Sequence, residues 1–213
     1  MAHTRIALAV HGGAGTSERA LMSVEREQAY RTALELALRH GHAVLAKGGA
    51  ALDAVEAAVR VLEDTPLFNA GRGSVFNADG QHEMDASLMN GADFRAGAVA
   101  GVQNVKNPVT LARRVMEQSN HVLISGLGAF EFAHQQKVEL EDDHYFFDQY
   151  RFDQWKEVVG TDRVQLDHSH KEKKFGTVGA VALDAQGHLA AATSTGGMTN
   201  KKWQRVGDSP IIG

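Results

Sequence analysis

The most constraining feature of the sequence is a pair of short, strand-forming runs near its C-terminal end. Residues 177–184 and 188–195 are rich in small, apolar and β-branched side chains, and the segment Asp184-Ala185-Gln186-Gly187 is typical of a tight turn. Together they predict an antiparallel β-hairpin. In such a hairpin the end of the second strand returns beside the start of the first. We therefore expect Thr195 to lie close to Thr177, within a residue or two.

Thr177 stands at the head of the first strand, directly after Gly176 and shortly after the charged run 171–174. A hydroxyl in this position can attack the Gly176 carbonyl, which has no side chain to shield it. Hydrolysis of the resulting ester would leave Thr177 with a free α-amine. Such an amine has an ordinary pKa of about 7.7–8.0 and can act as a base near neutral pH. The spacing permits an N-terminal nucleophile, although most Gly-Thr pairs are only junctions between a turn and a strand.

Composition excludes several other classes of protein. The 213 residues are 43% hydrophobic and 23% charged, enough for one large domain or two small ones with a buried core. The net charge of −4 gives no electrostatic basis for binding nucleic acid or an anionic membrane surface. The absence of cysteine excludes disulfides and thiolate chemistry. No segment has the apolar length of a membrane span or of a secretory signal, so we expect a cytoplasmic protein.

The rest of the chain predicts a mixture of strands and helices. Apolar periodicity, glycines, prolines and Asn-Gly or Asp-Gly pairs mark the boundaries of these elements. The expected strands are 6–10, 75–77, 82–89, 96–102 and 122–124, with hairpin turns at Asp79-Gly80 and Asn90-Gly91. The expected helices are 29–44, 51–64, 108–118 and 126–136.

Residues 137–175 differ in character from the segments before them. Aromatic side chains crowd residues 145–155, beside the acidic run 141–143. Acidic neighbours would repel phosphates, so we expect this segment to pack on the domain instead of binding single-stranded nucleic acid. Residues from about 157 to 175 are polar and predict an exposed, flexible linker. His168 and His170 lie in it without a third partner nearby, which makes a poor metal site.

Seven stretches follow one another in a fixed order along the chain. They are His11-Gly12-Gly13-Ala14-Gly15, Pro66-Leu67-Phe68-Asn69-Ala70-Gly71-Arg72-Gly73, Met84-Asp85-Ala86, Gly97-Ala98-Val99-Ala100-Gly101, Gly176-Thr177-Val178-Gly179, Thr193-Ser194-Thr195-Gly196-Gly197 and Arg205-Val206-Gly207-Asp208-Ser209-Pro210. Together they resemble the plant-type L-asparaginase and isoaspartyl peptidase family. The matches are spread over nearly the whole chain, and the last three together are highly specific.

The resemblance implies an α+β fold, namely the αββα four-layer sandwich of the N-terminal nucleophile hydrolases, here incomplete at its C-terminal end. It implies an inactive precursor that cuts itself between Gly176 and Thr177. Residues 1–176 would then be the α-subunit region, including the linker at about 157–175. Residues 177–213 would be the start of the β-subunit region. The working enzyme would be a dimer of such αβ units.

The resemblance also assigns roles to particular residues. Thr177 would be the catalytic nucleophile, oriented by Thr195. Arg205 would bind the substrate α-carboxylate and Asp208 its α-amino group, which suits a guanidinium and a carboxylate. Asn69 would help to shape the site. No organic cofactor is expected, but a structural sodium ion would be held by the main-chain carbonyl groups of Leu62, Glu63, Thr65, Phe68, Ala70 and Arg72.

The implied reaction is the release of L-aspartate from L-asparagine and β-aspartyl dipeptides, through an ester on Thr177. One alternative is a glycosylasparaginase-like hydrolase, for which a signal segment and cysteines would be expected. Another is a non-catalytic binding domain that keeps the fold. Family members continue past Gly213 with strands that complete the sheet and a Thr-Gly segment that forms the oxyanion hole. Since one oxyanion donor contributes about 10²–10³ in rate, we expect little or no asparaginase activity from the 213-residue chain alone.

Overall fold

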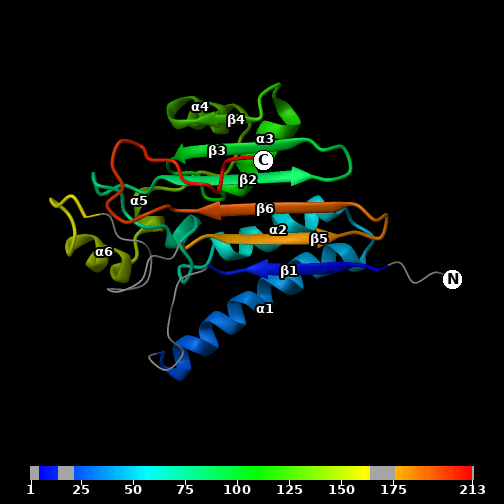
Figure 1. Cartoon of the computed structure of the whole chain (residues 1–213), viewed down its shortest axis with the longest axis horizontal. Helices are drawn as coiled ribbons and strands as arrows, with labels where there is room; N and C mark the ends of the chain where they lie inside the picture. The colour runs from blue at the N-terminus through cyan, green and yellow to red at the C-terminus, as the bar shows by residue number, and fades with distance from the viewer. Residues whose placement is uncertain (1–4, 14–21, 164–175, 213) are drawn as a thin grey trace.

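The computed structural model describes residues 5–13, 22–163 and 176–212, which form an α+β unit around one mixed sheet (Figure 1). The sheet has six strands in the order β1-β5-β6-β2-β3-β4. All neighbouring strands are antiparallel except β3 and β4, which are parallel. The strands are β1 (Ala7–His11), β2 (Met84–Asn90), β3 (Ala96–Val102), β4 (Leu123–Ser125), β5 (Val178–Leu183) and β6 (Leu189–Thr195).

The main helices pack on one face of this sheet, behind the strands in Figure 1. Helices α1 and α2 pack on the β1, β5 and β6 side, whereas α3 and α4 pack on the β2, β3 and β4 side. No helix of the described residues is long and apolar enough to cross a membrane. The helices are α1 (Val24–Ala46), α2 (Ala51–Glu63), α3 (Pro108–Gln118), α4 (Gly126–Gln135), α5 (Asp143–Phe146) and α6 (Gln149–Lys156), with one 3-10 turn, η2 (Gly71–Gly73).

The two faces of the central strands differ in burial. Alternate residues of β5 and β6 are alanines buried in the helical core, and their small size lets α2 pack closely on the sheet. On the other face Val181 and Leu189 are 53% and 61% exposed. The described residues therefore supply one sheet and one helical layer, and the residues of the candidate site gather where β5 begins and β6 ends.

Of the three expected hairpins, two are confirmed and one is wrong. The hairpin of 177–184 with 188–195 is confirmed, and so is the turn at Asn90-Gly91 between β2 and β3. The expected strand at 75–77 is wrong, because these residues pair with no neighbouring strand in the described structure. Instead, the Asn77 side-chain oxygen accepts the backbone N–H groups of Asp79 and Gln81 at 3.0 and 2.9 Å. This side chain closes a local turn, and β2 starts only at Met84.

The aromatic segment packs on the domain as expected. Phe76 contacts the rings of Phe147, Phe152 and Trp155, so α5 and α6 are anchored to the segment that precedes β2. The start of the expected linker forms turns, and the Asn200 side chain donates to the carbonyls at 158, 161 and 163. The remainder, residues 164–175 with both linker histidines, lies outside the described residues.

Candidate active site

The β5–β6 hairpin brings the two threonines together. Val178 pairs with Ser194 and Gly179 with Thr193, so the ladder leads directly to Thr177 beside Thr195. The Thr195 hydroxyl donates to the carbonyl oxygen of Gly176 at 2.8 Å. The proximity expected from the hairpin register is thus confirmed, and Thr195 contacts the peptide group that Thr177 would attack.

The Gly176 carbonyl accepts a second hydrogen bond, from the side-chain amide of Asn69 at 3.2 Å. Both donors are themselves held in place. Asn69 donates to the Gly197 carbonyl at 2.8 Å and accepts the Val75 N–H at 3.1 Å. The Thr195 oxygen accepts the Gly197 N–H at 3.1 Å. Two fixed donors on one carbonyl oxygen form the arrangement that stabilises an oxyanion.

A network of hydroxyl groups adjoins the Thr177 side chain. The Thr177 oxygen lies 3.4 Å from the Ser209 hydroxyl oxygen. The Ser209 carbonyl accepts hydrogen bonds from Ser87 at 2.7 Å and Thr193 at 2.8 Å. Sequence reasoning missed these three residues. Ser209 stands inside one of the family-like stretches, and that stretch was the signal that could have singled it out.

An apolar groove of about 260 Å³ opens beside Thr177 on the face of the sheet opposite the helices. Residues of the first, fifth and sixth strands line it, and Thr177 and Thr193 supply its hydroxyl groups. The Thr177 side chain is therefore reached from the open face of the sheet.

Arg205 and Asp208 lie in the segment after β6, away from the regular sheet. Arg205 is half-buried, with its guanidinium against Gly207, and Asp208 is exposed. Within the described residues, no hydrogen bond or ion pair joins either side chain to the two threonines. Their neighbour Ser209 makes that link instead. The structure thus brings together Thr177, Thr195, Gly176 and Asn69, but it does not join Arg205 and Asp208 to this group.

The predicted sodium loop is a series of tight turns between α2 and η2. Gly71 has a φ of +52°, and a Cβ there would lie 2.4 Å from the Glu63 carbonyl oxygen. A Cβ on Gly73 would lie 2.1 Å from the Phe68 carbonyl oxygen. The glycines therefore let the backbone approach the Glu63 and Phe68 carbonyl groups closely. The carbonyl oxygens of Leu62, Thr65, Phe68 and Ala70 accept backbone N–H groups within these turns, and sodium binding by this loop stays a prediction.

The Glu63 side chain lies on the helix-facing side of the sheet, next to Ser194 of the β5–β6 hairpin. One carboxyl oxygen accepts the Val109 N–H at 3.0 Å, and the whole residue is buried. Burial raises the pKa of Glu63 to about 8, against the smaller opposing effect of the Ser194 hydroxyl. The raised pKa favours the protonated carboxyl at neutral pH. Sequence reasoning considered only the main-chain carbonyl of this residue.

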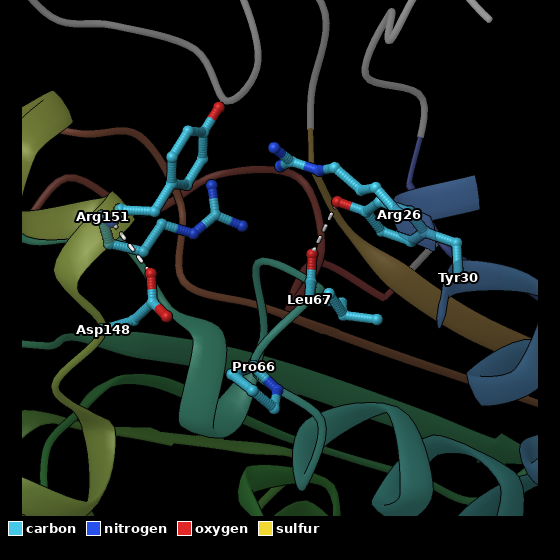
Figure 2. A pocket seen from close by; sticks show the side chains of 7 residues that line it. Arg26, Tyr30, Pro66, Leu67, Asp148 and Arg151 are labelled. Atoms are coloured by element: carbon cyan, nitrogen blue, oxygen red, sulfur yellow. Dashed lines mark hydrogen bonds between the residues drawn. The ribbon is translucent and has the colours of Figure 1, made fainter. Parts of the chain in front are cut away.

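Figure 2 shows a second pocket, which lies beside the loop and is lined in part by the loop residues Pro66 and Leu67. The Tyr30 hydroxyl donates to the Leu67 carbonyl at 3.1 Å, as the dashed line in the figure marks. The buried Arg151 donates to the Gly73 carbonyl at 3.0 Å, and its backbone N–H is held by Asp148. Helices α1 and α6 thereby hold the loop that carries Asn69.

Comparison with known proteins places the chain in a family. A family model described as asparaginase (Asparaginase_2) matches residues 4–213. The chain belongs to this asparaginase family. It is 50% identical over 210 residues to the isoaspartyl peptidase of Escherichia coli K12, covering 97% of the chain and 65% of that protein. It is 44% identical over 207 residues to the isoaspartyl peptidase/L-asparaginase of Homo sapiens, covering 96% of the chain and 64% of that protein. The chain spans 61% to 68% of the length of the curated relatives that it matches.

Proposed function

We propose that this chain carries the processing site of a threonine amidohydrolase that acts on L-asparagine and β-aspartyl dipeptides. The observation that carries the proposal is the Gly176 carbonyl, held by Asn69 and Thr195 directly before the hydroxyl of Thr177. The names of the relatives, isoaspartyl peptidase and isoaspartyl peptidase/L-asparaginase, support the substrate class. They favour it over a glycosylasparaginase-like hydrolase.

In the first step the chain cuts itself. The Thr177 oxygen forms a bond with the Gly176 carbonyl carbon, and the carbonyl oxygen takes up negative charge between its two donors. The C–N bond to Thr177 then breaks, and the proton lost by the hydroxyl reaches the departing nitrogen. The Ser209 hydroxyl, 3.4 Å from the Thr177 oxygen, is placed to relay that proton. Water hydrolyses the ester, which leaves a Gly176 carboxylate and a free α-amine on Thr177.

In the second step the same threonine attacks the substrate. Its α-amine takes the hydroxyl proton, and the oxygen forms an ester with the side-chain acyl group of the substrate. The C–N bond of the substrate breaks, the α-amine passes the proton to the departing nitrogen, and ammonia or an amino acid leaves. Water then releases L-aspartate. Arg205 would bind the α-carboxylate and Asp208 the α-ammonium group of the aspartyl moiety, since their charges are complementary to those groups.

Three further features belong to the proposal. A sodium ion bound by the loop carbonyls of residues 62–72 would stiffen the segment that carries Asn69. The mature enzyme would be a dimer of αβ units, and it would act in the cytoplasm. The cysteine-free sequence is consistent with a reducing compartment.

The test compares substrates in a single turnover. The processed chain is mixed with L-asparagine, a β-aspartyl dipeptide or a glycosylated asparagine. The reaction is quenched with acid, and the mass of the protein is measured by mass spectrometry. Because little asparaginase activity is expected of the 213-residue chain alone, we expect an aspartyl adduct that forms only slowly on Thr177 with the first two substrates. An adduct from the glycosylated substrate alone would favour the glycosylasparaginase alternative. A chain that neither cuts itself nor forms an adduct would favour the non-catalytic binding domain.

A further inference from the structure

A buried charged cluster lies directly behind the turn that ends β6. It consists of Lys201, Glu83 and Asp85, which are 2%, 4% and 1% exposed. The Lys201 ammonium donates to the Glu83 carbonyl oxygen at 2.7 Å and lies 3.9 Å from the Glu83 carboxylate. None of the chemistry described above uses these three side chains.

Asp85 ties the cluster to the sheet. It pairs with Thr195 in the β2–β6 ladder, and one of its carboxylate oxygens accepts the Gly101 N–H at 2.8 Å. The other oxygen is buried and has no hydrogen-bond partner among the described residues. Burial lowers the pKa of the Lys201 ammonium, whereas the negative charges of Asp85 and Glu83 act in the opposite direction. A cation at this place thus compensates carboxylates that would otherwise be buried alone.

The same ammonium packs against the turn that serves the processing site. A Cβ added to Gly197 would lie 3.0 Å from the Lys201 nitrogen and 3.2 Å from its Cδ. The Gly197 N–H donates to the Thr195 oxygen, and the Gly197 carbonyl accepts from Asn69. Gly197 therefore contacts both donors of the Gly176 carbonyl and lies next to Lys201.

We propose that Lys201 is a positioning residue: its ammonium, seated beside Glu83 and Asp85, fixes the turn of residues 195–197 and thereby aims Thr195 and Asn69 at the Gly176 carbonyl. The lysine acts through the turn and does not touch the reacting atoms. This inference rests on the proposed function for its catalytic consequence, but its structural content, a turn fixed by the lysine, stands independently.

The test compares Lys201→Met with the matched control Lys202→Met, whose ammonium makes a surface ion pair with Asp162 at 2.8 Å. Two quantities are measured in the purified chain: hydrogen–deuterium exchange of the amides in residues 195–198, and the rate of the cut before Thr177. For Lys201→Met we expect severalfold faster exchange in that turn, unchanged exchange in β3, and a cut slowed by about 100-fold. The control should match the wild type in both.

A double variant, Lys201→Met with Asp85→Asn, keeps the test valid if the single variant unfolds, because it removes the unpaired buried charge. The Glu83 carboxylate remains in it, but with one buried charge fewer it should fold and still show the looser turn and the slow cut. Wild-type exchange or a wild-type cutting rate in a folded Lys201 variant would overturn the proposal, and so would unfolding of both variants. If the wild-type chain makes no cut, the proposed function fails, and the exchange of residues 195–198 alone decides the role of the lysine.

Discussion

The candidate site has two parts that are built differently. The two donors to the Gly176 carbonyl come from the sheet and from a braced loop, and Asn69 and Thr195 each make additional hydrogen bonds that hold them. Arg205 and Asp208, in contrast, lie on an irregular segment that is partly open to solvent. In the proposed function, the first part acts on the chain itself and the second binds a separate molecule.

Under the proposed function, this difference predicts that processing and substrate recognition depend on separate residues. Preorganised donors stabilise a charge that develops on an atom already in place, and this requires fixed geometry. A bidentate ion pair with a free ligand gains binding energy from complementary charge, and the side-chain geometry can adjust when the ligand binds. Variants of the two parts should therefore affect different measurements, and the following predictions test that separation.

The largest effect is expected from Thr195→Val, which removes one donor from the Gly176 carbonyl. The cut before Thr177 should slow by about 10²–10³-fold. The rate is measured by gel densitometry of the freshly purified precursor. The control is Thr110→Val, since that hydroxyl donates to Glu56 at 2.7 Å, away from the site. An unchanged rate of the cut in Thr195→Val would show that Thr195 does not stabilise negative charge on the Gly176 carbonyl oxygen.

The next effect concerns the other part of the site. Arg205→Ala and Asp208→Ala should leave the cut at nearly the wild-type rate but weaken the binding of L-aspartate. A charge-assisted hydrogen bond contributes about 1.5–3 kcal/mol, so the Kd should rise roughly 10- to 100-fold. Isothermal titration calorimetry on the processed protein measures this Kd. Slow cutting with normal binding would reverse the assignment of the two parts.

A smaller effect, on stability, is expected from Gly71→Ala in the loop that carries Asn69. The new Cβ would meet the Glu63 carbonyl oxygen at 2.4 Å on a backbone with positive φ. Strain of this kind costs about 1–3 kcal/mol and should lower Tm. Gly48→Ala is the matched control, because Gly48 also has a positive φ but has open space around it. Equal losses of Tm would show that the close approach at Gly71 contributes nothing.

The smallest effect is a pH dependence that comes from His82 behind the loop. Its Nδ1 donates to the Ser74 carbonyl at 3.0 Å, and burial lowers the pKa of its imidazole below the ordinary value. At pH values below about 6.5, His82 binds a proton more readily in the unfolded chain than in the folded chain. Folding stability therefore falls as the pH drops. We expect the Tm difference between wild type and His82→Gln to shrink from pH 7.5 to 5. A constant difference would contradict this.

Part of the site could be predicted from local patterns. The proximity of Thr177 and Thr195 follows from strand periodicity and one turn, because a hairpin fixes its own register. The strand expected at 75–77 shows the limit of such patterns, since the Asn77 side chain closes a turn that strand propensity does not anticipate.

The rest depends on contacts between residues far apart in the sequence. Asn69 reaches Gly176 across 107 positions, and Lys201 reaches Glu83 across 118. No local period predicts such pairs, and only the family resemblance singled out Asn69. The strand order also could not be predicted, because β1 joins β5 and β2 joins β6 only through non-local pairing.

The most direct measurement is the intact mass of the purified 213-residue chain, followed over time next to the Thr177→Ala variant. If the held carbonyl of Gly176 is a processing site, the wild-type mass must separate into fragments 1–176 and 177–213 while the variant stays whole. A wild-type chain that keeps its full mass on long incubation would contradict the central claim. So would a cut at the same bond in the variant, since that cut would not need the threonine hydroxyl.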